Sequence, residues 1–244
     1  FDDCLKTADR HTFFKFMVKS VAENHGLRAT FMPKPFSNLT GNGCHAHISM
    51  WDQEAKNNLF LDASDENGLS VLAYEFLGGM IHNATVLCSI FNPTVNSYKR
   101  INAAVTTSGA TWSPNKVSWS GNNRTHMIRV PDAGRFEFRL MDGAVNPYLG
   151  QAAILAAGLD GIENKRKPGQ RLDIDMYAEP HKARGTKKLP LNLLDAIRLT
   201  DKSSRVRACL GNELIDSYVK LKTQEWESYC RDLSDWERQN TLDC

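Results

Sequence analysis

The chain has 244 residues, of which 41% are hydrophobic and 24% charged, and its formal net charge is +2. This length and balance indicate a folded protein with one large or two small domains. The near-neutral charge gives no reason to expect nucleic acid or an anionic membrane as a partner. The longest apolar run, from Ala152 to Leu159, is too short to cross a bilayer, and no signal-peptide pattern precedes it. We therefore expect a cytoplasmic protein. Six cysteines without Cys-x-x-Cys spacing favour reduced thiols over disulfides or cysteine-bound zinc.

The first third of the chain predicts helices joined by loops and one short strand. Apolar residues at helical spacing predict a helix over residues 7–25, with Gly26 placed to end it. A short strand is expected over 27–32 and a loop over 37–43. A long helix is predicted from about Leu69 to Phe91, where the pair Gly78 and Gly79 indicates close packing against a neighbour.

The stretch from Gly41 to Trp51 carries a His-x-His pair. As a strand it places His45, His47 and Ser49 on one face, and the opposite face is apolar or small, with Cys44, Ala46, Ile48 and Met50. Taken alone, such a pair is more often two satisfied sheet histidines than a ligand site.

The middle of the chain predicts a lid followed by a hairpin. Residues 101–123 are rich in Ser, Thr and Gly and contain Trp112 and Trp119, which favours an ordered functional lid. Residues 124–130 and 135–140 read as two strands joined by a turn over 131–134. Further helices are expected over 148–164, 191–199 and 211–230. The predicted class is α+β in one catalytic-type domain, with a largely antiparallel sheet as the floor of the site.

The second alternating strand changes the interpretation of the histidines. Arg135, Glu137 and Arg139 share one face, and Phe136, Phe138 and Leu140 share the other. Two such strands in one sheet would form a polar floor. Its carboxylate and imidazoles suit a divalent cation, and its guanidiniums suit phosphate or carboxylate anions.

Separated motifs in this chain resemble the glutamine synthetase family over nearly its whole length. They are Phe31–Pro35 with Gly41–Ser49, then Asn92–Arg100, then Asn123–Arg124 through Pro131, and finally Arg135–Arg139. The resemblance implies an ATP-dependent ligase that phosphorylates the side-chain carboxylate of glutamate and lets ammonia displace the phosphate, giving glutamine. An acyl phosphate supplies the leaving group that a carboxylate lacks.

The resemblance also implies roles for individual residues. His45 and Glu137 would hold the metal, Mg²⁺ or Mn²⁺. His47, Ser49, Arg129 and Arg135 would contact ATP. Gly41, Arg100, Arg124 and Arg139 would bind glutamate, and Arg124 and Arg139 would also act on the acyl phosphate. Without the motif, Glu137 between two arginines could equally be a ladder of sheet ion pairs.

The chain departs from the common family pattern in the lid. The family places an acid shortly after the arginine that corresponds to Arg100, and residues 101–106 contain none. The Ser/Thr-rich segment is closer to the branch with γ-glutamylmethylamide synthetases, so the acceptor could be ammonia, methylamine or another amine. Asp132 stands where a basic residue is common, and Thr40 where an asparagine is common.

The resemblance finally implies that residues 1–244 are an N-terminally truncated catalytic domain, because the sequence begins at Phe1. The family's small β-rich domain, first catalytic strands and further metal-binding glutamates would precede it, and the whole protein would form a homo-oligomeric ring. We expect this piece alone to bind metal and nucleotide weakly. The rival hypothesis is a catalytically degenerate homologue with a structural or regulatory role.

Overall fold

The computed structural model describes residues 2–103, 106–107 and 111–243, and the fold is α+β. Its helices are α1 (Cys4–Asn24), α2 (Val71–Asn83), α3 (Cys88–Phe91), α4 (Val95–Ile101), α5 (Pro147–Glu163), α6 (Leu193–Asp201), α7 (Ser204–Leu210), α8 (Asn212–Cys230) and α9 (Asp235–Thr241), with a 3₁₀ turn at Pro180–Lys182. Its strands are β1 (Ala46–Ile48), β2 (Trp119–Ser120), β3 (Ile128–Asp132) and β4 (Arg135–Phe138). None of the described helices combines the length and apolar character of a membrane span.

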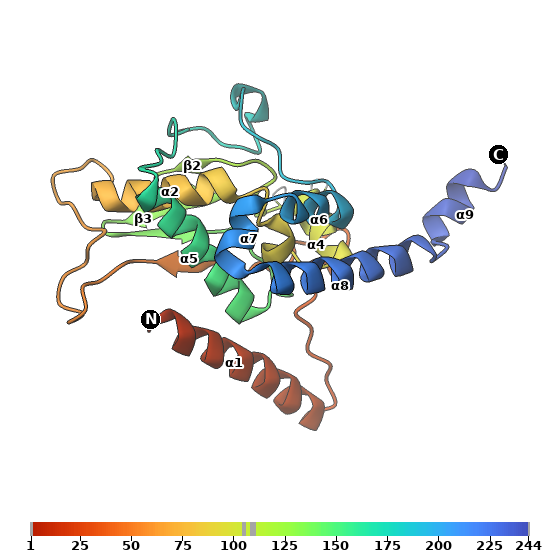
Figure 1. Cartoon of the computed structure of the whole chain (residues 1–244). Coiled ribbons are helices and arrows are strands. Elements are labelled where there is room, and N and C mark those ends of the chain that lie inside the picture. The colour runs from red at the N-terminus through yellow and green to blue at the C-terminus, as the bar shows by residue number, and fades with distance from the viewer. Residues whose placement is uncertain (1, 104–105, 108–110, 244) are drawn as a thin grey trace.

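The four strands form one sheet in the order β1-β4-β3-β2. β4 pairs antiparallel with both β1 and β3, and β2 adds to β3 in parallel. Helices α2 and α5 pack together beside the sheet. Helix α1 lies at the edge of the molecule, where it packs on α5 (Figure 1). The predicted hairpin is therefore confirmed, with β3 and β4 joined through Ala133 and Gly134.

The apolar face of β4 builds the core. Phe136, Phe138 and Leu140 are completely buried, as the alternation predicted. Phe136 stacks on Phe60 at 5.7 Å between ring centroids, and Phe138 meets Phe91 edge to face at 4.8 Å. Because this face is fixed by packing, the opposite face of β4 is held rigidly toward the polar side chains of the sheet.

The glycine pair in α2 lies where α2 and α5 are in close contact. A Cβ on Gly79 would lie 2.0 Å from the carbonyl oxygen of Ala157, and one on Gly161 would lie 2.0 Å from that of Glu75. The two backbones therefore approach more closely than any side chain allows. This confirms the close packing that the sequence predicted.

Three sequence predictions of secondary structure were wrong. Residues 27–32 form no strand, and at their end the main-chain oxygen of Met32 accepts a hydrogen bond from the Asn42 side chain in the following loop. The predicted helix from Leu69 to Phe91 is interrupted after Asn83. Trp119 lies buried in β2 and so is no part of a lid.

Helix α4 was not predicted, because residues 95–101 are largely polar. It begins with a capping box in which the side chains of Thr94 and Ser97 each bond the other's backbone N–H. The short helices α7 and α9 were also missed. The predicted lid over 101–123 lies partly outside the described residues.

Candidate active site

The register of the sheet brings the predicted polar residues together. His47 pairs with Glu137 across β1 and β4, and Arg129 pairs with Glu137 across β3 and β4. Residues directly opposite in a sheet share a face, so these three side chains meet. Residues 45, 47 and 49 are exposed, whereas their neighbours 46, 48 and 50 are partly buried, as the predicted two-sided strand requires.

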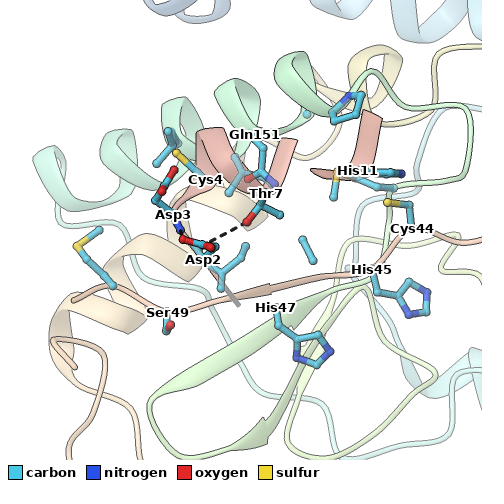
Figure 2. Close-up of a pocket in the computed structure, with 18 of the residues that line it drawn as sticks. Asp2, Asp3, Cys4, Thr7, His11, Cys44, His45, His47, Ser49 and Gln151 are labelled. Carbon is cyan, nitrogen blue, oxygen red and sulfur yellow. Dashed lines mark hydrogen bonds between the residues drawn. The ribbon is translucent and has the colours of Figure 1, made fainter. Parts of the chain in front are cut away.

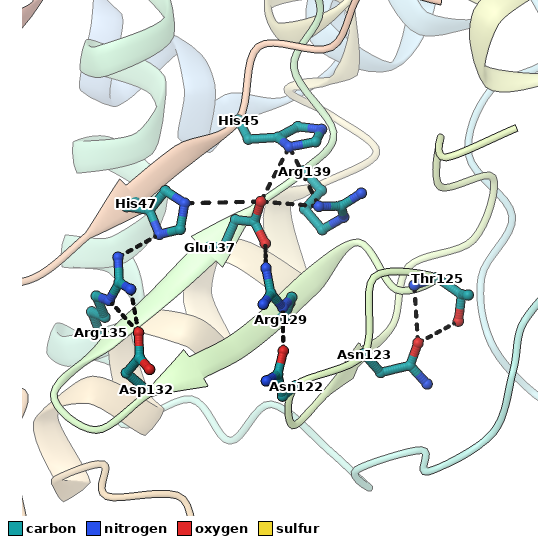
Figure 3. Close-up of polar contacts among 10 residues, drawn as sticks. All are labelled: His45, His47, Asn122, Asn123, Thr125, Arg129, Asp132, Arg135, Glu137 and Arg139. Carbon is teal, nitrogen blue, oxygen red and sulfur yellow. Dashed lines mark hydrogen bonds and ion pairs between the residues drawn. The ribbon is translucent and has the colours of Figure 1, made fainter. Parts of the chain in front are cut away.

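Glu137 stands at the centre of this polar floor (Figure 3). Its Oε1 lies 3.1 Å from His45 Nδ1 and accepts a hydrogen bond from Arg139 Nη1 at 2.9 Å. Its Oε2 accepts a hydrogen bond from Arg129 Nη1, also at 2.9 Å. The side chain is only 4% exposed, so two arginines and a histidine surround an almost completely buried carboxylate.

The charges around Glu137 keep it ionised. Burial alone would raise its pKa, but hydrogen bonds from His45 and Arg129 and the charge of Arg139 lower the pKa to about 2. A carboxylate ionised at every physiological pH is a suitable ligand for a hard divalent cation.

His47 is held by a different partner. Arg135 Nη1 donates to His47 Nδ1 at 3.0 Å, and Arg135 also pairs with Asp132. Arginine only donates, so the His47 proton resides on Nε2, which faces Glu137 Oε1 at 3.9 Å. Partial burial lowers the pKa of His47, and the charge of Arg135 adds to this effect although Glu137 opposes it. The lowered pKa widens the pH range in which the imidazole of His47 is neutral.

Arg100 is buried behind this floor. Its Nη1 donates to the Leu140 carbonyl at 2.9 Å and its Nη2 to the Arg139 carbonyl at 3.3 Å. Two glycines give it room: a Cβ on Gly41 would lie 3.1 Å from its Cγ, and one on Gly43 would lie 3.0 Å from its Nη2. The same Cβ on Gly43 would lie 2.8 Å from His45 Nε2, so the side chains of Arg100 and His45 both lie close to Gly43.

Two of the predicted site residues stand outside the network. Arg124 is exposed and has no hydrogen-bond or ion-pair partner among the described residues. Ser49 accepts a hydrogen bond from Trp51 Nε1 at 3.0 Å and does not contact Glu137 or its arginines. The structure therefore gathers His45, His47, Arg129, Arg135, Glu137 and Arg139, with Arg100 and Gly41 adjacent.

A cavity of about 820 Å³ lies between α1, α5 and the strand that carries the histidines. Figure 2 shows the imidazoles of His45 and His47 pointing away from its α1 wall, where Asp2 and Thr7 lie. The cavity is mainly apolar, and its lining includes His45, His47 and Ser49 as well as Ala46 and Ile48.

Sequence reasoning missed several residues that border the floor. Asn122 accepts a hydrogen bond from Arg129 Nε at 2.8 Å. Asp142 is completely buried and accepts a hydrogen bond from Asn92 Nδ2 at 2.9 Å. Burial raises the pKa of Asp142, against the opposing charge of Arg100. An acid placed three residues after Arg139, before a glycine, was the available signal for Asp142.

The side chains of the floor supply only part of the ligand set that a divalent cation needs. His45 and Glu137 lie together, but no group of three or more His, Cys, Asp or Glu side chains able to hold a metal occurs among residues 2–103, 106–107 and 111–243. Both Glu137 oxygens already accept hydrogen bonds from arginines. An octahedral cation would need further oxygen ligands from elsewhere.

Comparison with known proteins agrees with this geometry. Residues 1–241 match the family model described as the glutamine synthetase catalytic domain. The chain is 63% identical over 243 residues to a glutamine synthetase of Rhizobium leguminosarum bv. phaseoli, covering 100% of this chain and 56% of the relative. It is 43% identical over 248 residues to a glutamate–methylamine ligase of Methyloversatilis universalis, covering 100% of this chain and 55% of that relative.

Solved structures of GmaS, a γ-glutamylmethylamide synthetase, have the same fold. The ADP complex of GmaS superposes with a TM-score of 0.93 at 62% identity, covering 100% of this chain and 56% of that one. The ligand-free form gives a TM-score of 0.90 at 59% identity, covering 99% and 54%. The chain spans about half the length of the curated relatives it matches. It therefore belongs to the glutamine synthetase catalytic domain family.

Proposed function

We propose that the protein containing this chain is an ATP-dependent ligase that joins ammonia to the side-chain carboxylate of glutamate, giving glutamine, ADP and phosphate. The observation that carries this proposal is the Glu137 cluster, where one ionised carboxylate and two histidines, His45 and His47, lie among three guanidiniums, those of Arg129, Arg135 and Arg139. Such a floor can hold a cation and several phosphate or carboxylate oxygens at once.

The reaction divides into two displacements. A γ-carboxylate oxygen of glutamate attacks the terminal phosphorus of ATP, and ADP leaves. The amine nitrogen then attacks the acyl carbon, the carbon–oxygen bond to phosphate breaks, and the nitrogen loses a proton. Guanidiniums stabilise the charge that develops on the transferring phosphoryl oxygens, because they are preorganised and screened from water.

The residues of the floor are proposed to contact different substrates according to their positions. Arg129 and Arg135, with His47 and Ser49, are proposed to contact ATP. Arg139 and Arg100, with the backbone at Gly41, are proposed to bind glutamate. Arg124 is proposed to join Arg139 at the acyl phosphate, and its exposed side chain leaves it free to turn toward a ligand. A bound Mg²⁺ or Mn²⁺, held in part by His45 and Glu137, would neutralise phosphate charge.

Methylamine is the second candidate acceptor, and specific observations favour it. The segment 101–123 contains no Asp or Glu, so it supplies no carboxylate to receive an ammonium ion. A glutamate–methylamine ligase and GmaS are among the proteins to which the chain is similar. The product would then be a γ-glutamyl methylamide.

We further propose that residues 1–244 form the catalytic part of a longer protein that assembles as a homo-oligomeric ring in the cytoplasm. Support for a longer protein comes from the half-length match to the relatives and from the incomplete set of metal ligands in the described residues, and the ring and the cytoplasmic location rest on the family resemblance alone. A catalytically degenerate homologue would show the same fold without turnover.

Product analysis tests the proposal. The full-length protein is incubated with ATP, Mg²⁺, glutamate and either ammonia or methylamine, and the products are identified by mass spectrometry. We expect glutamine or γ-glutamyl methylamide to accumulate in a one-to-one ratio with ADP and phosphate. ADP formation without an amide product, or no ADP formation, would contradict the proposal and favour the degenerate homologue.

A further inference from the structure

A segment far along the chain is anchored beside the polar floor. Asn123 Nδ2 and His126 Nε2 both donate to the Ile174 carbonyl at 2.9 Å, and the Met176 N–H donates to Thr125 Oγ1 at 3.0 Å. These contacts fix residues 174–176 onto the loop before β3. Tyr177 follows at once, so its ring position is determined by the same anchors.

The Tyr177 hydroxyl is buried and makes no hydrogen bond of regular geometry among the described residues, although the Thr111 side chain lies close enough to lower its pKa. Arg139 Nε is also buried without a hydrogen-bond partner among the described residues. Burial raises the pKa of Tyr177, and the hydrogen bond with Thr111 and the charges of Arg139 and Arg100 oppose that rise. Buried polar groups are nearly always paired in native proteins, so two such atoms beside a proposed substrate site indicate a place for a ligand's polar atoms.

Trp112 completes an aromatic pair with Tyr177. The two ring centroids lie 6.3 Å apart at an interplanar angle of 87°. In this edge-to-face arrangement the ring that presents its edge keeps both faces uncovered by its partner. Trp112 has a φ of 54°, which is strained for a bulky residue, and such strain concentrates at functional sites.

The chemistry of the pair suits a small organic cation. Residues 101–123 carry no acid, and both oxygens of Glu137 already accept hydrogen bonds from arginines. Asp175 is exposed, and its Oδ1 accepts the backbone N–H groups of Tyr177 and Ala178. Aromatic faces attract ammonium groups and contact alkyl groups, which makes them the usual recognition element for alkylated ammonium. Burying a single methyl group changes affinity about fourfold.

Resting on the proposed ligase function, we propose that Trp112 and Tyr177 select the acceptor amine. Their rings hold the alkyl group of a small primary alkylamine, and the Tyr177 hydroxyl contacts its nitrogen. Ammonia has no group for the rings to hold. The pair therefore determines specificity for methylamine over ammonia, while Arg100 and Arg139 bind glutamate independently of the acceptor.

The test compares acceptors in the full-length protein. The ratio of kcat/KM for methylamine to kcat/KM for ammonia is measured at saturating ATP and glutamate for the parent, Trp112→Leu, Trp112→Phe, Tyr177→Leu and Tyr177→Phe. Trp236→Leu is the matched control, because Trp236 is 67% exposed on α9. We expect the ratio to fall by up to about fourfold in both leucine variants, which is the worth of one buried methyl group. We expect Trp112→Phe to keep most of the methylamine preference. The KM for glutamate should change little in these variants.

Tyr177→Phe separates the ring from the hydroxyl. It should keep the methylamine preference but lower kcat/KM for both amines, because only the contact with nitrogen is lost. If the leucine variants leave the ratio at the parent value, whether or not both rates fall together, the aromatic pair only packs the loop and the inference is wrong. If a leucine variant does not fold, Tyr177→Phe decides, because parent-like kcat/KM for both amines in that variant would contradict the contact with nitrogen and overturn the inference. A parent without amine-dependent turnover would instead contradict the proposed function itself.

Discussion

At the scale of single residues, Glu137 determines the charge balance of the site. Among the described residues it is the one acid that contacts His45, Arg129 and Arg139 at hydrogen-bond or ion-pair distance. Its alternation with buried Phe136 and Phe138 fixes its direction. Removing its charge would leave two guanidiniums facing each other in a poorly solvated place, which is strongly unfavourable.

The first prediction concerns metal affinity. Glu137→Gln keeps the size of the side chain but removes the negative charge that a cation requires. We expect the affinity of the full-length protein for Mn²⁺ to fall at least about 10-fold, measured by titration calorimetry. Glu227→Gln, on exposed α8, is the control and should bind as the parent does. Equal affinity in both variants would show that Glu137 is no ligand.

The second prediction concerns the contact at Gly43. An added Cβ would lie 2.8 Å from His45 Nε2 and 3.0 Å from Arg100 Nη2, both at ends of side chains that can move. Gly43→Ala should therefore fold normally but displace both groups, and a displacement of about 1 Å lowers turnover about 100-fold. Steady-state kinetics together with a melting curve check this. Parent-like turnover would mean that the two groups need not keep their positions beside Gly43.

At the scale of elements, the α2–α5 contact supports the core on which the sheet rests. Gly79→Ala would force a Cβ to within 2.0 Å of the Ala157 carbonyl, which is backbone and cannot turn aside. We expect a loss of about 1–3 kcal/mol in the free energy of unfolding, measured by urea denaturation. Gly121→Ala is the control, because its nearest atom is Arg171 Nη2 at 3.4 Å. Equal stability of the two variants would contradict the packing.

The anchor beneath Tyr177 should make stability depend on pH. His126 is completely buried; burial lowers its pKa below the ordinary 6.5, while the hydrogen bond to Ile174 and the charges of Asp173 and Asp175 oppose this. The folded state thus binds fewer protons than the unfolded state below about pH 6.5, so this contribution is complete above that pH and is lost as pH falls.

The measurement is the melting temperature of the parent and of His126→Asn between pH 5 and 7.5, a range chosen about the ordinary pKa of histidine. The parent should lose stability more steeply on acidification than the variant, which has no proton to gain. Parallel curves would show that His126 titrates equally in the folded and unfolded states.

Sequence periodicity predicted the elements with one buried face and failed where long-range contacts decide. β4 was predictable because its apolar residues alternate, and α5 because it begins at Asn146-Pro147 and is rich in small apolar residues. α4 was missed because Asn96, Lys99 and Arg100 interrupt its apolar pattern. The docking of residues 174–177 depends on Asn123, Thr125 and His126, about fifty positions away, and no local pattern records such a contact.

The same distinction applies to the site. The meeting of His47 with Glu137 followed from two alternating strands in one sheet. The chemical roles came from the family resemblance, and the geometry brings most of those residues together without testing what they bind. Arg124 is exposed, and its predicted role remains a prediction.

At the scale of the whole molecule, the site is rich in guanidiniums and poor in carboxylates. Among the described residues the floor offers a cation one carboxylate and two imidazoles, while Arg100, Arg129, Arg135 and Arg139 supply positive charge. We therefore expect residues 1–244 alone to bind Mn²⁺ more weakly than the full-length protein, measured by the same calorimetric titration. Equal affinity would mean that these residues hold the complete metal site.

The most direct test of the central claim is phosphate release from ATP by the full-length protein, with glutamate present and ammonia or methylamine added in turn. It is measured for the parent, His45→Ala, Glu137→Ala and the control His82→Ala, whose side chain is exposed on α2. The account predicts release that requires both glutamate and an amine, collapses in the first two variants and persists in the control. Release that ignores glutamate, or that survives in His45→Ala and Glu137→Ala, would contradict it.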